Sequence, residues 1–385
     1  MDFTLADEIP HIRQAVRELC AAFPGEYWRE LEPDSYPEEF VAELTRQGWL
    51  AALIPEQYGG AGLPIATASV ILEEICASGG NAGACHAQMY TMGTVLRHGT
   101  EEQKAEYLPQ IASGGLRLQA FGVTEPDAGS DTTSIKTRAR RVDGGYVING
   151  QKIWTSRAEH SDLMVLLART TPRSDVEKKT DGLSVFLVDM REAGPALTIR
   201  PIKTMMNHAT TEVFFEDLLV PESALIGEEG RGFRYILDGM NAERILIAAE
   251  CIGDGRFFLE RASDYARDRK VFGRAIGANQ GVQFPLARAY MSVQAADLMR
   301  WKAAWLYDCG MASAAEGNMA KFLASEASWQ AANAALDTHG GFGFAAEYDI
   351  ERKFRETRLY QVAPISNNLV QAFVGQHVLE LPRSY

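Results

Sequence analysis

The spacing of apolar residues along this chain of 385 residues changes twice, and this change limits the folds that it can adopt. Up to about residue 115, apolar residues recur every three or four positions, as in ATASVILEEICASGG, which predicts amphipathic helices. From about residue 117 the period shortens towards two, as in DLMVLLART and TEVFFEDLLVP, a pattern typical of strands. After Gly230 the helical period returns. The sequence therefore predicts an α+β multidomain protein with domains at residues 1–116, 117–232 and 233–385.

The strand region contains a strong local turn signal. The dipeptide Asn149-Gly150 lies between YVI and KIW. Because Asn-Gly between two apolar runs favours a two-residue turn, we expect a tight hairpin there. The sequence has neither a GxGxxG motif after a strand nor a GxxxxGK(S/T) motif. A dinucleotide cofactor would therefore have to be held by other means.

The composition argues against several classes of function. A net charge of −13 without a long Lys/Arg run makes nucleic acid a poor partner. We expect no membrane span and no signal peptide, because no window is apolar enough and the segment MDFTLADEIPHIRQ has no apolar core. The five scattered cysteines favour free thiols and a cytoplasmic location. The seven histidines have no HxH or HExxH spacing, so no metal site is expected.

Seven segments, in order, carry a resemblance to a known family. They are IPEQYGGAGL (54–63), HGTEEQKAEYLPQIASG (98–114), FGVTEPDAGSD (121–131), INGQKIWTS (148–156), VFFEDLLVP (213–221), YARDRKVFGRAIGANQGVQFPLA (265–287) and HGGFGFAAEYDIERKFRETR (339–358). Together they resemble the acyl-CoA dehydrogenase family. The resemblance implies an N-terminal α-helical domain, a middle β-barrel domain and a C-terminal four-helix-bundle domain. It also implies FAD as cofactor, an acyl-CoA substrate, an electron-transferring flavoprotein as acceptor, and a homotetramer or homodimer.

One half of the FAD site implied by the resemblance lies in the strand region. Val123 and Thr124 would contact the pyrimidine edge of the flavin, and Ser130 would lie near the pyrophosphate or the acyl thioester. Trp154 would pack on the ring, and Ser156 would hydrogen-bond flavin N5. Taken singly, Thr124 and Ser130 would be turn residues and Trp154 a core strand residue.

The other half lies in the C-terminal helices, and in the family it comes partly from a neighbouring subunit. Arg269 and Phe272 resemble the arginine and aromatic residue beside the pyrophosphate, and Gln280 follows in the matching place. Gly340 and Gly341 would bring backbone close to the same cofactor. An arginine fork suits a pyrophosphate geometrically, although Arg269 alone would more often be a solvated helix end.

The catalytic base is the point at which the chain departs from most of the family. Most members have a Glu at the position of Pro364, but a subset typified by isovaleryl-CoA dehydrogenase carries it on a helix immediately before an Arg. Glu243-Arg244 matches that position, so Glu243 is the candidate base, and Arg244 is a candidate substrate contact or a structural residue. Glu243 could instead be a helix first-turn acid. Because proline has no N–H to help hold the thioester carbonyl, Ile365 or Ala363 could donate instead, or Ser366, Asn367 or Asn368 could assist.

The leading hypothesis is an FAD-dependent acyl-CoA dehydrogenase that converts an acyl-CoA thioester to the 2,3-enoyl-CoA, with Glu243 as base and hydride transfer to flavin N5. Two alternatives stay open at this point. One is a flavoprotein of the same fold with altered chemistry, such as an oxygenase, an oxidase or an elimination from an acyl thioester, because Pro364 removes both the usual base and a hydrogen-bond donor. The other is a non-catalytic binding protein that keeps the fold.

Overall fold

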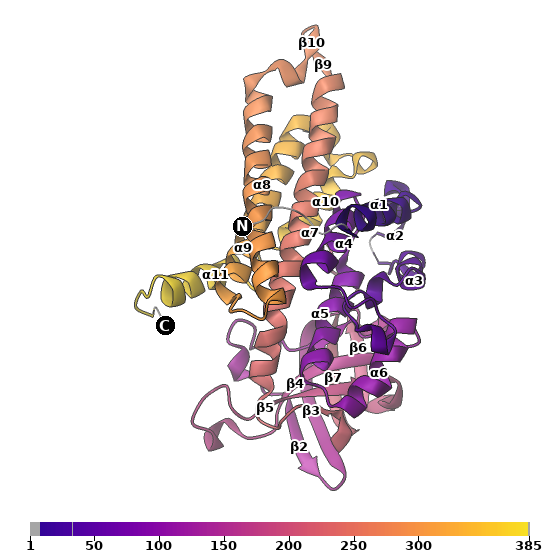
Figure 1. Cartoon of the computed structure of the whole chain (residues 1–385), viewed down its shortest axis with the longest axis vertical. Coiled ribbons are helices and arrows are strands. Elements are labelled where there is room, and N and C mark those ends of the chain that lie inside the picture. The colour runs from indigo at the N-terminus through magenta and orange to yellow at the C-terminus, as the bar shows by residue number, and fades with distance from the viewer. Residues whose placement is uncertain (1–7, 33, 384–385) are drawn as a thin grey trace. The chain divides into compact units, whose positions relative to one another are not determined.

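A computed structural model describes residues 8–32 and 34–383 of the chain (Figure 1). These residues divide into two compact units. The helical unit contains the chain up to Glu32, Pro64–Ala82 and the chain from Asn241 onward. The sheet unit contains residues 34–63 and Gly83–Met240. The predicted three-domain boundaries are not the boundaries of these two units, and they stay a prediction.

Long helices form most of the helical unit. Its helices are α1 (Glu8–Ala21), α2 (Gly25–Leu31), α4 (Ile65–Ala77), α7 (Gly232–Asp268), α8 (Gln280–Asp308), α9 (Ala314–His339), α10 (Ile350–Leu359) and α11 (Asn367–Phe373). The helix α7 begins in the sheet unit and continues into the helical unit. Figure 1 shows α7 and α8 running side by side, joined at one end by a small hairpin of β9 (Lys270–Val271) and β10 (Arg274–Ala275).

Small residues allow these helices to approach closely. A Cβ added at Gly255 of α7 would lie 2.7 Å from Val293 of α8, and one at Gly253 would lie 2.3 Å from the carbonyl oxygen of Glu73 in α4. The buried side of α9 is rich in alanine, including Ala324, Ala327, Ala331 and Ala335. Because interaxial distance depends on the size of the side chains at the contact, these residues bring the helices of the bundle together.

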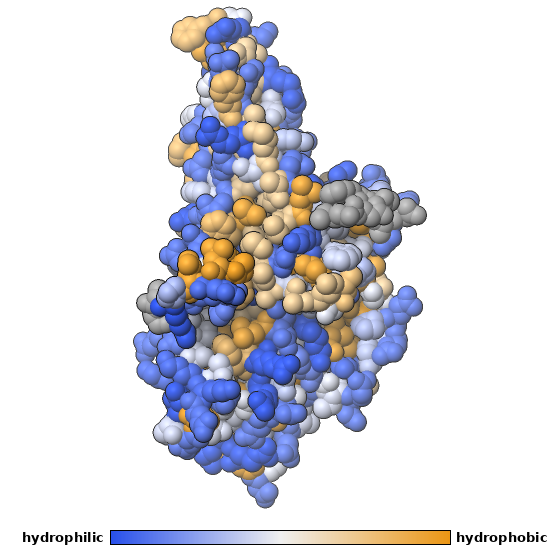
Figure 2. All heavy atoms as spheres, turned by 60° about the vertical axis from the view of Figure 1, so that its left-hand side comes forward, coloured by the Kyte–Doolittle hydropathy of each residue, from blue (hydrophilic) through white to orange (hydrophobic). Residues whose placement is uncertain are grey.

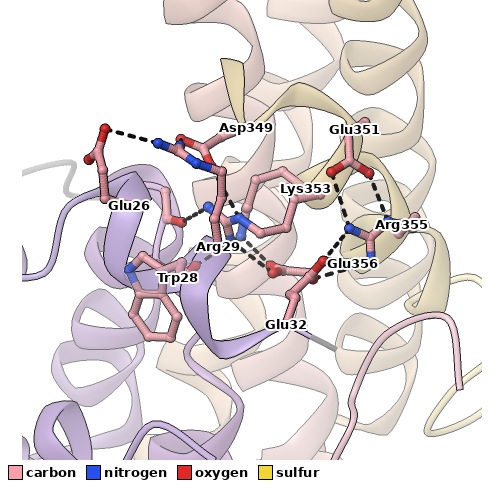
Figure 3. Close-up of polar contacts among 12 residues, drawn as sticks. Glu26, Trp28, Arg29, Glu32, Asp349, Glu351, Lys353, Arg355 and Glu356 are labelled. Carbon is pink, nitrogen blue, oxygen red and sulfur yellow. Dashed lines mark hydrogen bonds and ion pairs between the residues drawn. The ribbon is translucent and has the colours of Figure 1, made fainter. Parts of the chain in front are cut away.

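Ion pairs join α10 to the first part of the helical unit (Figure 3). Arg29 donates to Asp349 over 2.8 Å, and Arg355 bonds both Glu351, over 2.9 Å, and Glu32. Asp349 directly precedes α10. These contacts fix the helix that leads into the segment containing Pro364.

The sheet unit consists of a mixed sheet with helices α3 (Glu38–Arg46), α5 (Gly83–His98) and α6 (Glu101–Ser113). The strands are β1 (Ala120–Gly122), β2 (Arg138–Val142), β3 (Gly145–Ser156), β4 (Leu163–Arg169), β5 (Leu183–Asp189), β6 (Leu197–Pro201), β7 (Thr210–Pro221) and β8 (Leu225–Ile226). Their hydrogen-bonded order is β6-β7-β3-β2-β4-β5-β8, and β1 also pairs with β4. Most neighbours are antiparallel, but β4 is parallel to β1 and β2.

The centre of this sheet is buried on both faces. In β4, Leu163, Val165 and Leu167 belong to a core that includes Met92 of α5 and Leu108 of α6. The alternating residues Met164, Leu166 and Ala168 belong to a second core with Tyr146, Phe186 and Phe215. Because neighbouring side chains of a strand point to opposite faces, DLMVLLART reads as a continuous apolar run rather than as a strict alternation.

The hairpin predicted at Asn149-Gly150 is wrong. These residues lie inside the continuous strand β3, where the register with β7 shifts by a β-bulge between Ile148 and Gly150. The Asn149 side chain exchanges two 2.9 Å hydrogen bonds with Asp217 of β7. The actual β2–β3 turn follows Val142, where Gly144 has a φ of 78°. Asp143-Gly144 is itself an Asp-Gly turn signal, so the sequence contained two candidates.

Two features of the described residues bear on membrane and metal binding. None of the helices in residues 8–32 and 34–383 is long and apolar enough to cross a bilayer. The same part of the chain has no group of three or more His, Cys, Asp or Glu residues arranged to hold a metal ion. Residues 1–7, which begin the segment used to argue against a signal peptide, lie outside the described residues.

Candidate active site

A buried ion pair holds the loop that follows β1 against β3 in the sheet unit. Lys152 of β3 is buried, and its ammonium donates to Glu125 over 2.8 Å and to the carbonyl of Val123 over 3.0 Å. The Glu125 carboxylate also accepts from the backbone N–H groups of Lys136, over 2.6 Å, and Thr137, over 2.9 Å. Burial opposes the charge of Glu125, but Lys152 and these donors hold its pKa below the usual value. The loop is thereby fixed at its start and at its end.

Trp154 lies next to this loop in an unusual backbone conformation. The carbonyl of Thr124 accepts a 2.9 Å hydrogen bond from the N–H of Ile153, the residue before Trp154. Trp154 has a φ of 61° at a second register shift of β3, and its side chain is 56% exposed. A positive φ is costly for a bulky residue and persists only where the surroundings impose it. An exposed indole held in this way fits a residue that presents its flat face to a ligand ring.

Ser156, at the end of β3, has a hydroxyl suited to donating. Its Oγ accepts a 2.7 Å hydrogen bond from the side chain of Asn207, which has a φ of 55°. Because that bond uses a lone pair, the hydroxyl hydrogen of Ser156 stays available for an acceptor such as flavin N5. Ser130 is exposed in the loop after β1. The structure thus brings Val123, Thr124 and Trp154 together, whereas it shows no contact between Ser130 and that group.

The predicted residues of the helical unit lie near the β9–β10 hairpin and after α9. The guanidinium of Arg269 lies 5.6 Å from the ring centre of Phe342, and Tyr265 stacks on His339 at 4.3 Å. Phe272 is fully exposed at the hairpin turn, with a φ of 52°. Arg269 and the 339–344 segment are therefore neighbours, as a shared ligand requires.

Two further features of this region leave space for a ligand. Gly340 has a φ of 58°, and a Cβ added at Gly340 or Gly341 would meet nothing within 4 Å. Gln280, the first residue of α8, is exposed. Because glycine has no side chain, a phosphate can approach the backbone at residues 340 and 341 closely, although the N–H of Gly340 already donates to the carbonyl of Leu336.

Glu243 and Arg244 are both buried on α7. Arg244 donates to the side chain of Asn241 over 2.8 Å, and its Nε is buried without a hydrogen-bond partner among the described residues. Burial lowers the pKa of Arg244, while the charge of Glu243 opposes that change. The charge interaction between Glu243 and Arg244 favours the charged form of each, against the burial of both side chains.

The polar residues after Pro364 have structural partners. Ser366 caps α11 by accepting from the N–H of Leu369 over 3.3 Å. Asn367 is buried and bonds Lys321 of α9 over 2.7 Å. Asn368 is exposed. Of the three residues suggested to help hold the thioester carbonyl, Ser366 and Asn367 are therefore already engaged in holding α11 in place.

Sequence reasoning missed four residues that support these sites: Glu125, Lys152, Asn207 and Lys321. One signal was present for Lys152. Counting by two from Ile148 along β3 places Lys152 on the buried face, and a lysine at such a position needs a buried partner. The sequence does not name that partner, because Glu125 lies 27 residues away.

Family models match the three parts of the chain in order. They describe the acyl-CoA dehydrogenase N-terminal domain at residues 6–115, the middle domain at 120–218 and the C-terminal domain at 230–369. The chain belongs to the acyl-CoA dehydrogenase family, and both the predicted family and the predicted fold class are confirmed. Acyl-CoA dehydrogenase FadE12 of Mycobacterium tuberculosis is 37% identical over 383 residues and covers 97% of each chain. Cyclohex-1-ene-1-carbonyl-CoA dehydrogenase of Syntrophus aciditrophicus is 35% identical, covering 95% of this chain and 87% of its own.

Solved structures give the same fold. Glutaryl-CoA dehydrogenase in complex with glutaryl-CoA has a TM-score of 0.92 at 28% identity, covering 100% of this chain and 98% of its own. The FAD complex of PigA has a TM-score of 0.91 at 26% identity, covering 99% of this chain and 100% of its own. A chain from work on the electron transferring flavoprotein of Acidaminococcus fermentans has a TM-score of 0.92 at 28% identity, covering 98% and 100%.

Proposed function

We propose that this protein is an FAD-dependent acyl-CoA dehydrogenase that converts an acyl-CoA thioester to its 2,3-enoyl-CoA. The observation that carries the proposal is the arrangement around Trp154 in a chain of this family. Thr124, the exposed indole and the Ser156 hydroxyl lie on adjoining backbone held by a buried ion pair. That arrangement offers an apolar face and a hydroxyl donor, both of which a flavin ring requires.

The reaction needs a base at the α-carbon and an acceptor for the hydride that leaves the β-carbon. FAD, when bound, supplies the hydride acceptor. Glu243 takes the α-proton on its carboxylate, and the positive charge of Arg244 favours the ionised form that can do so. Thr124 and Ser156 orient the cofactor, and Trp154 covers the ring. Val123 supports Thr124 from the preceding position of the loop, and Ser130 contributes a hydroxyl to the same loop.

The cofactor phosphates are assigned to residues of the helical unit. Arg269 provides a charged, forked donor, and Phe272 and Gln280 flank it in sequence. Gly340 and Gly341 offer backbone without side chains, which a phosphate can approach closely. Support for this assignment comes from the family resemblance and from the proximity of Arg269 to Phe342.

Anaerobic reduction by substrate tests the function. Purified protein should contain FAD, and one or more members of a panel of short, branched, aromatic and long acyl-CoAs should bleach it. Glu243→Gln should retain FAD and lose turnover by at least about 10³-fold. Glu260→Gln on the exposed side of the same helix is the matched control and should keep wild-type turnover. Bleaching at the wild-type rate in Glu243→Gln would remove Glu243 from the mechanism.

The electron acceptor in this proposal is an electron-transferring flavoprotein. Support comes from the family and from the similar chain solved in work on such a flavoprotein. Turnover in the presence of that partner should exceed turnover with oxygen as the acceptor. A cytoplasmic location is part of the same proposal and is supported by five cysteines that are all free.

A second candidate function is altered flavin chemistry on an acyl thioester, and Pro364 is the observation that favours it. Proline lacks the N–H that could support the thioester carbonyl, and loss of one such donor costs about 3 kcal/mol of transition-state stabilisation. PigA, which was solved with FAD and proline, has this fold. Oxygen consumption by substrate-reduced protein, stoichiometric with an oxidised or hydroxylated product, would establish this candidate in place of dehydrogenation.

We also propose that the chain forms a homodimer or homotetramer through α8. Phe284, Met291, Leu298 and Trp305 recur every seven residues and are 57% to 63% exposed. A stripe of large apolar residues with this repeat is typical of a helix that packs on another helix. Figure 2 shows apolar residues in a band along the long helices of the helical unit.

Solution mass tests this interface. Leu298→Glu should reduce the oligomer to a smaller species in light scattering, because a charge in a packed apolar seam is not solvated. Leu219→Glu, at an equally exposed leucine of β7, is the control and should not change the mass. An unchanged mass in Leu298→Glu would exclude α8 from the interface.

A further inference from the structure

Lys321 is a buried lysine whose two hydrogen-bonding partners are neutral oxygens. It lies on α9 with no exposed surface. Its ammonium donates to the carbonyl of Ile365 over 2.8 Å and to Oδ1 of Asn367 over 2.7 Å. Both acceptors belong to the segment that follows Pro364. The contact therefore joins α9 directly to the position at which most of the family has its base.

Other polar side chains strengthen the same attachment. Asn367 also bonds Ser325, over 3.1 Å, and Glu326, over 2.8 Å. Gln361 donates to the same Glu326 oxygen over 2.9 Å, and the N–H of Asn367 donates to the carbonyl of Gln361 over 3.0 Å. The segment 361–367 is thus fixed to one turn and a half of α9, with Asn367 at the centre of the network and Lys321 bonded both to it and to Ile365.

The charges that face Lys321 come from α7 and α9. Burial lowers the pKa of Lys321 to about 8. That value includes the effect of Arg244, which also lowers the pKa, and the opposing effects of Cys251, Glu326 and Glu243. Burial keeps the pKa of the Cys251 thiol well above its ordinary value, so at neutral pH this thiol is uncharged. Lys321 therefore shares its surroundings with one cation, Arg244, and two carboxylates, Glu243 and Glu326.

We propose that Lys321 is a positioning residue of the dehydrogenation site: its ammonium orders the segment containing Pro364, and its charge stabilises the ionised form of Glu243. The proposal rests on the function proposed above, with Glu243 as base. Because its hydrogen-bond acceptors are uncharged, Lys321 keeps a net positive charge that acts on nearby carboxylates through a poorly solvated interior. The hydrogen bonds from Lys321 to Ile365 and Asn367 fix the segment around residue 364 although that residue is a proline.

Lys353 shows that this arrangement is not general for buried lysines of the helical unit. It is also fully buried, but its ammonium contacts two carboxylates, Glu356 over 2.7 Å (Figure 3) and Asp254 over 2.8 Å. It also donates to the carbonyl of Gly80. Its charge is therefore compensated locally. Besides burial, the groups with the largest effects on its pKa are Asp254, Glu356, Cys76 and Arg352. Lys353 is a matched control for removing a buried ammonium.

The expected sign follows from the charges. Removing the positive charge of Lys321 disfavours ionised Glu243 and raises the pKa of that carboxyl. The base is then protonated over a wider range of acidic pH, so the acidic limb of kcat/KM moves to higher pH. Arginine at the same position keeps the charge, so the acidic limb of kcat/KM should stay at its wild-type pH.

The test compares pH profiles of kcat/KM for the FAD-loaded enzyme, using an acyl-CoA that the wild type turns over. Lys321→Met should move the acidic limb up by about one pH unit. Lys321→Arg should restore the wild-type limb. Lys353→Met should lower the thermal midpoint and leave the limb unchanged. If Lys321→Met does not yield folded holoenzyme, Lys321→Gln removes the charge while keeping a donor, and the same shift is expected.

Two outcomes would overturn the inference. One is an acidic limb of kcat/KM that stays at the wild-type pH in Lys321→Met or Lys321→Gln. The other is a shift of that limb in Lys321→Arg as large as in the uncharged variant, which would reveal a purely structural role. Failure of the proposed function looks different, because Glu243→Gln would then turn over normally. An inactive Glu243→Gln together with an unshifted Lys321 variant would reject the inference and keep the function.

Discussion

The two halves of the predicted FAD site are supported in different ways. In the sheet unit, the residues assigned to the flavin ring stand on a loop and a strand held together by the buried pair Glu125–Lys152. In the helical unit, the residues assigned to the phosphates are exposed, and Phe272 has its whole side chain in solvent. A ring that must meet its substrate in one orientation needs rigid support, whereas an arginine can reach a phosphate from a surface position.

The difference also bears on the assembly proposed above. The sheet half is complete within the described residues of one chain, since its loop, strand and ion pair all belong to the sheet unit. The helical half presents Phe272 and two open glycines to solvent. Aromatic side chains are enriched at protein interfaces relative to the rest of the surface. We therefore expect the sheet half to depend on folding and the helical half to depend on ligand and assembly.

The largest effect that sharpens this comparison is expected from Lys152→Met. The substitution leaves Glu125 buried without its cation, and breaking a buried ion pair by removing one partner costs about 3–5 kcal/mol. The free energy of unfolding in urea and the FAD content should both fall. Lys136→Met is the control, because its ion pair with Asp127 is exposed at both ends and such pairs contribute at most about 1 kcal/mol. Equal stabilities of the two variants would refute the role given to the pair.

The sequence predicted the order of helices and strands because the apolar period responds directly to burial. It failed at Asn149-Gly150, because local turn propensity cannot reveal that Asn149 pairs with Asp217 across 68 residues. There a long-range contact converts a turn dipeptide into a bulge within one strand.

The candidate site shows the same limit. Family motifs pointed to Trp154 and Ser156, but nothing local indicated that Asn207 would donate to Ser156 or that Lys321 would hold Ile365. Both supporting residues are distant in sequence from the groups they bind. Chemistry-bearing residues are found by their type and motif, whereas the residues that position them are defined only by tertiary contacts.

A smaller effect is expected in the helical half from Arg269→Lys. Lysine keeps the charge but loses the planar fork that matches a pyrophosphate, so FAD affinity should fall by about 10- to 30-fold, or about 1.4 to 2 kcal/mol. The stability of the FAD-free chain should not change, because Arg269 is exposed. Arg267→Lys, two residues earlier and also exposed, is the control and should bind FAD normally. Equal FAD affinity in both variants would remove Arg269 from the phosphate site.

The smallest effect is expected from a pair of alanine substitutions in the 339–344 segment. Gly340 has φ 58° and ψ −131°, a conformation that side chains disfavour, so Gly340→Ala should cost about 1 kcal/mol of folding free energy. Gly341 has no such φ and open space around it, so Gly341→Ala should leave stability unchanged. If Gly341→Ala nevertheless weakens FAD binding in a titration, the space beside Gly341 is filled by cofactor. If it binds FAD as the wild type does, the phosphate contacts in this half depend on Arg269 rather than on backbone at residue 341.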